Sequence, residues 1–460
     1  MRTPEPRPHP RLHPHPAAPR GRHVLRTALL VTALLAACRT VERRAASARP
    51  EAGRLQRDIA YLADDRLEGR GTGTAGNDSA ASWLGRRHAA LGLKPVVVDT
   101  TRNGCATDRG RPACRVFLQS FTARGAELAH AGRPEGLRTQ NVVAMVPGRD
   151  LALAREFVVV GAHFDHLGRS PASALDPEAR DAIRNGADDN ASGTAAVLEL
   201  ARLFATQPAR RSIVFAHFTA EELGLLGSQW FVEHSPVALD SVVAMVNFDM
   251  VGRLRNDRVI VYGVGTAREL PALLDSANIE PKLRISAVGD GFGPSDHSSF
   301  YAKGIPVLHF FTDLHDDYHR ATDDIEKIDA AGEARVVTLA ERTVRAIADR
   351  PGRLSPVRMA APSLSPARQG SNVYLGTIPD MAASDTPGLR LTGVRPGSPA
   401  DKGGLAAGDV IVQFAGREVK DLYGYSDALY AHKPGDEVEV VYLRGGTRHS
   451  TRVTLGARGQ

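Results

Sequence analysis

The sequence predicts an α/β fold in which a mostly parallel, mixed sheet lies between helices, followed by a small β-rich domain. Between residues 141 and 348, β-branched runs of strand length alternate with apolar-periodic segments of helix length. Such alternation is typical of a sheet whose strands are joined by crossover helices. Beyond a stretch rich in Pro, Ser and Arg, short strand-like runs follow, separated by glycines. The length of 460 residues also indicates more than one folded unit.

The N-terminal part of the chain predicts an export signal. A cluster of arginines precedes the apolar run 27–37 (TALLVTALLAA), which is too short to span a bilayer but suits the core of a signal peptide. Leu35-Ala-Ala-Cys38 resembles the bacterial lipobox, in which cleavage frees a cysteine that then carries lipid. We therefore expect an exported protein that is held at the membrane of the bacterial cell envelope through lipid on Cys38. The alternative is an ordinary signal peptide with an incidental cysteine.

The other two cysteines are Cys105 and Cys114. Export would place them in an oxidising compartment, where they could close the polar, turn-rich loop between them. Two free thiols are the alternative. A zinc site at this position is not expected, because no second pair of Cys or His accompanies them.

The pattern predicts the elements of the first folded unit in order. The segment from Arg54 to Leu93 is helical in pattern and is followed by a strand at Val96–Asp99. Strands are expected at Asn141–Val146, Glu156–Gly161, Ser212–Thr219, Val242–Met250, Arg258–Tyr262 and Pro306–Phe311. Helices are expected at Ala195–Phe204, Glu222–His234, Glu269–Ala277 and Ala331–Ala348.

Residue types that bind metal ions follow the predicted strands. The relevant segments are His163-Phe-Asp165, Gly186-Ala-Asp-Asp189-Asn-Ala-Ser-Gly193, Ala220-Glu221-Glu222, Asn247-Phe-Asp249 and Asp317-Tyr318-His319. Any one of them could be a satisfied polar group or a helix cap. Their recurrence at successive strand ends favours a site for zinc or a related divalent ion. Two adjacent glutamates would also repel each other unless a metal ion or a proton compensated.

This ordered set resembles the di-zinc exopeptidases of the aminopeptidase S and aminopeptidase Y type, over roughly residues 55–348. The motifs are HFD, GADDNASG, AEELGLLGS, NFDMVG and DYH, together with SDHSSFYAKGIP at 295–306. The resemblance implies two zinc ions. His163 and Asp249 would bind one ion, Glu222 and His319 would bind the other, and Asp189 would bridge both. It also implies that the peptide bond after Asp189 is often cis.

The resemblance further implies a mechanism. Glu221 would be the general base, taking a proton from a water shared by the two ions and handing it to the leaving amine. Asp165 would hydrogen-bond the far nitrogen of His163 and fix its tautomer. Tyr318 would donate to the tetrahedral oxyanion, although a packing role beside His319 is an equal alternative. Peptides or proteins would be the substrates.

The C-terminal part resembles a PDZ domain of the kind attached to bacterial proteases. The most specific stretch runs from Val394 to Gly416, with glycines and a Gly-Asp-Val-Ile segment at 408–411. Such domains take an extended C-terminal peptide as an added strand. Its carboxylate would lie on backbone amides near Tyr374 to Thr377; a domain without a ligand is the alternative.

The expected divisions of the whole chain are a signal peptide at 1–37, a tether at 38–53, a catalytic domain at 54–350, a linker at 351–367 and a PDZ-like domain at 368–457.

Other functions were weighed against an aminopeptidase. A carboxypeptidase or a glutaminyl-cyclase-like acyltransferase would keep the fold, and a PDZ-centred peptide-binding adaptor would make the enzyme secondary. The net charge of +6 does not predict nucleic-acid binding, because many of the Arg and His residues lie in the first fifty positions and no basic helix follows.

Overall fold

The computed structural model describes most of the chain beyond the predicted export signal. The described residues are 49–99, 107–108, 111–112, 114–125, 128, 133, 135–170, 174–176, 178–280, 282–358, 373–379, 387–394, 397–420 and 422–457. The predicted signal peptide, Cys38, Cys105 and most of the predicted tether and linker lie outside these residues. Cys114 is disulfide-bonded. Among the described residues, no helix combines the length and the apolar character needed to cross a bilayer.

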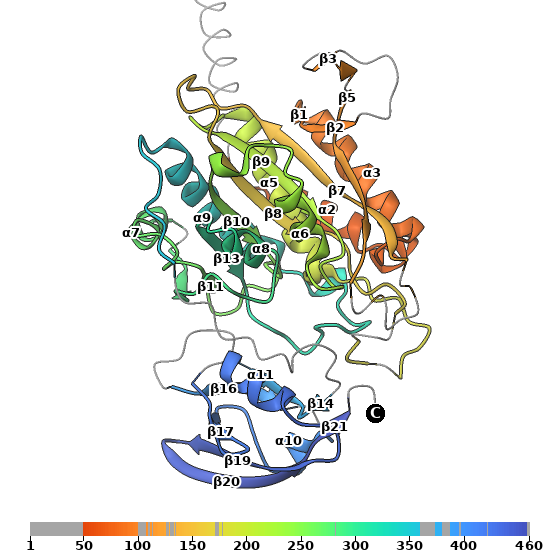
Figure 1. Ribbon diagram of the computed structural model, residues 1–460, viewed down its shortest axis with the longest axis vertical. Helices are drawn as coiled ribbons and strands as arrows, with labels where there is room; N and C mark the ends of the chain where they lie inside the picture. Colours follow the sequence, from red (N-terminus) through yellow and green to blue (C-terminus); the bar gives the residue numbers. More distant parts are fainter. Residues whose placement is uncertain are drawn as a thin grey trace, which may run out of the picture. The chain divides into compact units, whose positions relative to one another are not determined.

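The first folded unit is built on a nine-stranded mixed sheet (Figure 1). The strand order is β1-β7-β9-β8-β10-β13-β11-β12, with β6 paired to β7. Its strands are β1 (Lys94–Pro95), β6 (Leu118–Ala123), β7 (Leu137–Val146), β8 (Phe157–His163), β9 (Ser212–Phe218), β10 (Val242–Phe248), β11 (Arg258–Tyr262), β12 (Arg284–Ala287) and β13 (Val307–Phe311). The central strands β9, β8, β10 and β13 are parallel to one another, whereas β7 and β11 run antiparallel to them. The predicted mixed sheet is therefore confirmed, with its parallel strands at the centre and antiparallel pairs towards both edges.

Helices cover both faces of this sheet (Figure 1). One face carries α2 (Ala52–Leu62), α3 (Ala75–Ala90), α5 (Gly193–Thr206) and α9 (Ala330–Asp349), with α7 (Leu270–Ala277) packed on α9. The other face carries α6 (Leu226–Glu233) and α8 (His297–Ala302). Separate apolar cores fill the two faces, because every residue of β9 and β10 is buried and side chains leave these strands on alternating sides.

One predicted helix begins later than its pattern indicates. A helix was expected from Glu222, but α6 begins at Leu226. The backbone of Ala220, Gly224 and Leu225 has positive φ angles of 56°, 100° and 62°, which a right-handed helix does not allow. Glu221 and Glu222 therefore lie in a turn after β9. The strand predicted at Val96–Asp99 is β2 (Val97–Asp99), which forms a small hairpin with β5 (Cys114–Val116). The strand β5, the pair β3 (Thr107–Asp108) and β4 (Arg111–Pro112), and α8 and β12 were not predicted.

The C-terminal unit is a small β-rich domain with its own core. Its main sheet has the order β15-β16-β17-β19-β20, with β18 paired to β17, and β14 pairs with β21. The strands are β14 (Val373–Tyr374), β15 (Thr377–Pro379), β16 (Leu389–Val394), β17 (Val410–Phe414), β18 (Arg417–Glu418), β19 (Glu437–Arg444), β20 (Thr447–Thr454) and β21 (Gly456–Ala457). Two helices, α10 (Pro399–Lys402) and α11 (Leu422–Tyr430), accompany them. Residues such as Ile411, Phe414 and Val440 are fully buried.

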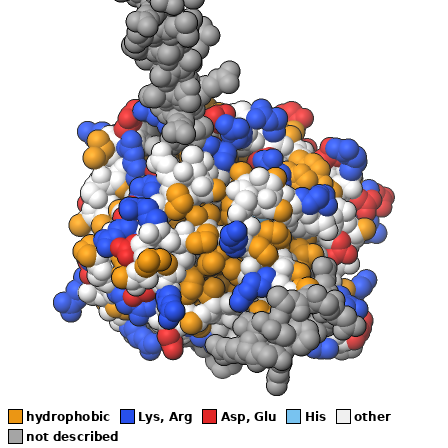
Figure 2. Space-filling view, turned by 90° about the horizontal axis from the view of Figure 1, so that it is seen from above, with side chains coloured by type: hydrophobic (Ala, Val, Ile, Leu, Met, Phe, Trp, Pro, Cys, Tyr) orange, Lys and Arg blue, Asp and Glu red, His pale blue; other side chains and the backbone are white. Residues whose placement is uncertain are grey.

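Lysine and arginine side chains are scattered over the face of the molecule drawn in Figure 2. They are interspersed there with acidic and hydrophobic side chains.

Candidate metal and active site

The carboxyl ends of the parallel strands bring the predicted site residues to one edge of the sheet. β8 ends at His163, and Asp249 directly follows the end of β10. Glu221 and Glu222 follow β9, and His319 lies in the segment after β13. Strands that run in the same direction end at the same edge, which is where open α/β sheets bind ligands.

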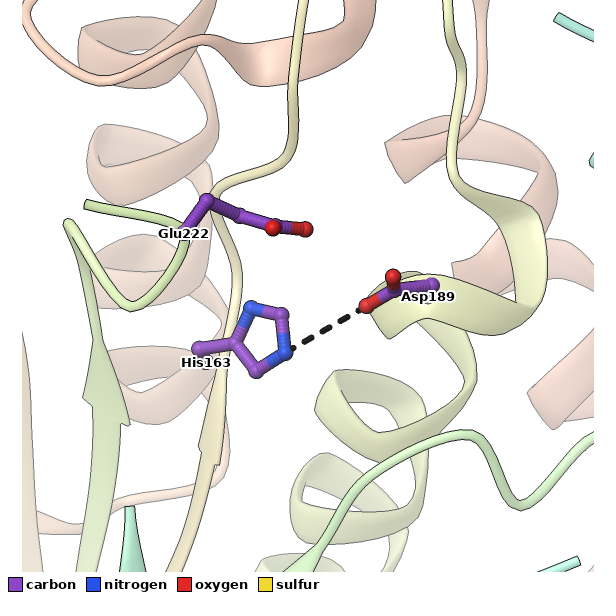
Figure 3. Close-up of side chains that lie close together, drawn as sticks. All are labelled: His163, Asp189 and Glu222. Atoms are coloured by element: carbon purple, nitrogen blue, oxygen red, sulfur yellow. Dashed lines mark ion pairs between the residues drawn. The ribbon is translucent and has the colours of Figure 1, made fainter. Parts of the chain in front are cut away.

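Asp189 connects two groups of side chains at this edge. Nε2 of His163 lies 3.4 Å from Oδ1 of Asp189 and 3.4 Å from Oδ2 of Asp249. Nε2 of His319 lies 3.2 Å from Oδ2 of Asp189 and 3.2 Å from Oε2 of Glu222. Figure 3 shows His163, Asp189 and Glu222 converging from separate segments of the chain. Each oxygen of Asp189 therefore faces a different histidine, as a bridging carboxylate requires.

The turn that carries Asp189 is held tightly. The peptide bond between Asp189 and Asn190 is cis, as the resemblance implies. The side chain of Asn190 donates to the carbonyl oxygen of Phe248 at 2.9 Å and accepts from the amide of Gly193 at 2.9 Å. These bonds tie the turn to the end of β10 and to the start of α5.

The donor set fits divalent metal ions. Ligand atoms of His163, Asp189 and Glu222 lie within 4.8 Å of one another, and so do those of His163, Glu221 and Asp249. Oδ1 of Asp249 is buried without a hydrogen-bond partner among the described residues. Nitrogen and carboxylate ligands of this kind suit zinc and related ions. A cation would also offset the repulsion among carboxylates that are gathered in a buried place.

Charges within the cluster shift the pKa values of its members. Burial opposes the charged form of His163, but Asp249 and Glu221 raise the pKa of its imidazole well above its usual value. Burial likewise opposes ionisation of Glu222, but His319 and His166 hold its pKa well below its usual value. The pKa of His319 is raised well above its usual value because Glu222 and Asp189 outweigh the effect of burial. These ionised and protonated groups stabilise one another across the cluster.

Glu221 faces the His163 group rather than the His319 group. Its Oε2 lies 3.9 Å from Nε2 of His163, and its backbone amide donates to Oδ1 of Asp165 at 3.2 Å. Burial raises the pKa of Glu221 well above its usual value, against the attraction of His163 and with added repulsion from Glu222. Although adjacent in sequence, the two glutamates therefore have different partners.

Asp165 contacts His163 differently from the expected geometry. Nδ1 of His163 donates to the backbone carbonyl oxygen of Asp165 at 3.1 Å, whereas the carboxylate Oδ1 is 3.7 Å away. The carboxylate instead accepts from the hydroxyl of Thr72 at 2.9 Å and from the amide of Glu221. The ring of His163 is thus oriented by the backbone, and the carboxylate of Asp165 holds Glu221.

Tyr318 lies beside the cluster. Its ring stacks on that of His319 with 3.9 Å between centroids, and it packs against the small apolar cluster that contains Met250 and Phe311. Burial, together with the charges of Asp189 and Glu222, raises the pKa of its phenol well above its usual value. A neutral phenol can still donate a hydrogen bond. Donation by Tyr318 to an oxyanion, which the resemblance implies, stays a prediction.

The structure adds residues that the sequence reasoning missed. Oδ2 of Asp323 accepts from the backbone amides of Asp188 and Asp189, each at 3.0 Å. The hydroxyl of Ser295 donates to Oδ2 of Asp249 at 2.8 Å. Nδ1 of His166 lies 2.8 Å from Oε1 of Glu222. The signal for His166 was its place three residues after His163 in the HFDH segment, and Ser295 lies in the SDH segment.

Arg70 is a further missed residue, and it is completely buried. Its guanidinium donates to the carbonyl oxygens of Phe164 at 2.7 Å, Asn185 at 2.7 Å and Gly186 at 3.1 Å. Burial lowers its pKa to about 10, against the attraction of nearby carboxylates that include Asp165. Arg70 therefore joins the end of β8 to the turn that carries Asp189 and supplies a fixed positive charge beneath them.

The C-terminal domain has the loop that was expected to hold a peptide carboxylate. Gly376 in this loop has a φ angle of +89°, and a Cβ atom there would lie 2.2 Å from Cβ of Ser398. Among the described residues, β15 pairs with β16 on one side only. The hydroxyl groups of Thr377 and Tyr425 lie 2.8 Å apart and connect β15 with α11.

Comparisons with known proteins agree with this architecture. Residues 141–344 match the model of peptidase family M28, and residues 371–455 match the model of the PDZ domain. The aminopeptidase YwaD of Bacillus subtilis is 31% identical over 207 residues, which cover 41% of this chain and 40% of that protein. Leucine aminopeptidase 2 of Trichophyton rubrum is 29% identical over 187 residues, which cover 39% of this chain and 34% of that protein. The matched region thus spans less than half the length of these relatives.

Solved structures share the fold of the first unit. A leucine aminopeptidase precursor from Bacteroides thetaiotaomicron has a TM-score of 0.51 at 17% identity, covering 65% of this chain and 97% of that chain. A glutaminyl cyclase from Porphyromonas gingivalis has a TM-score of 0.50 at 18% identity, covering 64% and 98%. One fold thus serves two reactions in these proteins, so the fold alone does not decide between them. Residues 141–344, which carry all of the predicted metal-binding residues, therefore match peptidase family M28, and residues 371–455 match a PDZ domain.

Proposed function

We propose that the protein is an aminopeptidase that removes N-terminal residues from peptides. The observation that carries the proposal is the separation of two adjacent glutamates. Glu222 pairs with His319 at 3.2 Å, whereas Glu221 lies near His163 at 3.9 Å. One carboxylate is therefore available to bind metal and the other to move a proton.

We further infer two zinc ions per chain. His163 and Asp249 would hold one, Glu222 and His319 the other, and Asp189 would serve both. When bound, such ions polarise a scissile carbonyl and lower the pKa of a water molecule.

The chain's own side chains would carry the proton and orient the reacting groups. Glu221 would accept the proton of the attacking water at its carboxylate and deliver it to the amine that leaves. The amide of Glu221 is held by Asp165, which fixes the turn that carries the carboxylate. Tyr318 would donate its phenolic proton in a hydrogen bond to the oxyanion of the tetrahedral intermediate.

The test is a panel of aminoacyl fluorogenic substrates with free and with acetylated N-termini. The aminopeptidase proposal predicts release from the free substrates, no release from the acetylated ones, and loss of activity in the presence of a chelator that zinc reverses. Release from acetylated substrates, or from the C-terminus of a peptide, would contradict it. Peptides that begin with glutamine should be added, because ammonia release with ring closure would identify a cyclase instead.

Two further parts of the proposal concern location and partners. We propose that Cys38 carries lipid and holds the protein at the bacterial cell envelope, on the basis of the Leu35–Cys38 segment. We also propose that the PDZ domain binds the C-terminus of a peptide beside β15. Deletion of residues 368–460 should then abolish peptide capture and leave turnover of small aminoacyl substrates unchanged, whereas loss of both activities would contradict separate roles.

A further inference from the structure

Among the residues that the structure describes, His166 is the one histidine that contacts a predicted metal-binding carboxylate at hydrogen-bond distance and has no role assigned by the sequence motifs or the family match. Its Nδ1 lies 2.8 Å from Oε1 of Glu222 and 3.7 Å from Oδ2 of Asp189. The other oxygen of Glu222, Oε2, lies 3.2 Å from Nε2 of His319. The two oxygens of this carboxylate are therefore divided between two histidines.

The ring of His166 is fixed from several sides. Its side chain is completely buried, and its backbone forms a bridge with Gly71. The ring lies against Gly186, where a Cβ atom would come within 2.5 Å of its Cδ2 and Cγ. Because Gly186 is also held by Arg70 through its carbonyl oxygen, the ring has little room to turn.

The unused ring nitrogen indicates which role His166 has. Nε2 of His166 is buried and has no hydrogen-bond partner among the described residues. A histidine that binds a metal almost always donates its other N–H to a carboxylate, a carbonyl oxygen or water. A neutral imidazole with its proton on Nδ1 instead donates to Glu222 and leaves only a lone pair at Nε2. The environment of the ring therefore fits a hydrogen-bond donor better than a ligand.

We propose that His166 is a positioning residue: its Nδ1–H fixes Oε1 of Glu222, so that Oε2 stays beside His319 for metal binding. The inference rests on the proposed metal-dependent function, since it concerns how one metal-binding carboxylate is held. Without this bond the carboxylate could rotate away from His319, and the ligands would have to be ordered when the metal binds. Loss of such a supporting contact typically weakens metal affinity about 10- to 100-fold.

The experiment compares three substitutions in metal-free full-length protein. The amide nitrogen of an asparagine occupies nearly the place of Nδ1, so His166→Asn should keep a donor to Glu222. A glutamine places its amide nearer the position of Nε2, and a leucine has no donor. Asparagine and glutamine are both poor zinc ligands, so this matched pair separates donation from ligation. Zinc affinity is measured by competition with a chromophoric chelator, which does not depend on turnover.

If His166 is a positioning residue, the affinity of the weaker of the two zinc-binding steps should fall about 10- to 100-fold in His166→Gln and His166→Leu. In His166→Asn that affinity should stay within a few-fold of the value for the unchanged protein. It also predicts that His166→Gln has no added effect when Glu222→Gln is already present, because the shared contact is gone. Equal losses in the asparagine and glutamine variants would overturn the proposal and make His166 a ligand. Unchanged affinity in the glutamine variant would overturn it as well. If the unchanged protein bound no zinc, the proposed function itself would fail, which is a different result from either of these.

Discussion

Replacement of Glu221 by glutamine removes a proton acceptor and keeps the shape of the side chain. Its carboxylate is held near His163 at 3.9 Å, and its backbone amide is anchored by Asp165 at 3.2 Å. Neither contact is a bond to Glu222 or His319, so the second group of ligands should stay intact. Loss of general acid–base catalysis typically costs about 10²–10⁴-fold in rate, or about 3–5 kcal/mol in the activation free energy. We therefore expect turnover to collapse in Glu221→Gln while both metal ions remain bound.

The assay measures zinc content and kcat on the same purified samples. Glu222→Gln should lose zinc as well as activity, because it removes a ligand rather than a base. Glu233→Gln, at the exposed end of α6, is the matched control and should change neither quantity. A Glu221→Gln protein with full zinc and normal kcat would refute the assignment of the general base. One that has lost zinc would show that Glu221 is a ligand, as its place beside His163 and Asp249 would allow.

Three further predictions follow from the metal ligands, the N-terminus and a buried histidine pair. Asp189→Asn should weaken zinc binding at both steps of a titration, because each carboxylate oxygen faces a different histidine; loss of only one step would contradict a bridging role. Cys38→Ser should release the protein from membranes or block its maturation, and unchanged membrane fractionation would contradict lipidation. His88 and His217 share a buried contact of 2.9 Å between their Nε2 atoms, and burial lowers the pKa of His88 to about 3 and that of His217 well below its usual value. The unfolded state therefore binds more protons below about pH 6.5, and the free energy of unfolding should fall as the pH drops. His88 alone should account for a fall of about 2 kcal/mol between pH 7 and pH 5. Urea titrations at the two pH values should show a smaller fall in the His88→Gln variant, and an equal fall would contradict the assignment.

The strand-end pattern predicted much of the site because sheet geometry converts sequence order into proximity. His163 and Asp249 lie far apart in the chain, yet each stands where a strand of the same direction ends. To bring these two residues together, the fold has only to place β8 and β10 side by side and parallel, as it does. The GADDN segment and His319 lie in connections, so their approach to His163 came from the family resemblance rather than from periodicity.

The residues that were missed depend on how loops meet, which no local pattern encodes. Arg70 is the last residue of a short 3-10 helix (Asp65–Arg70) in a glycine-rich segment, where an exposed side chain is the ordinary expectation for arginine. It is buried because the carbonyl oxygens of Phe164, Asn185 and Gly186 converge on it. The late start of α6 has a similar cause, since the apolar period continues into residues whose backbone is left-handed. The periodicity of apolar residues indicates which face of a segment is buried. It does not indicate at which residue the preceding turn ends and the helix begins.

The buried carboxylates of the site are ordered by contacts outside the set of expected ligands. Asp249 accepts from Ser295, Glu222 from His166, and the backbone of Asp189 donates to Asp323. Each contact fixes a carboxylate or the turn that carries it, yet together they hold negative charges near one another in a buried place, which costs free energy. A fold that maintains such repulsion gains stability when a cation binds, because the ligand stabilises only the folded state. The same contacts that orient the ligands should therefore make the free energy of unfolding depend strongly on zinc, and that dependence should weaken when any one of them is removed.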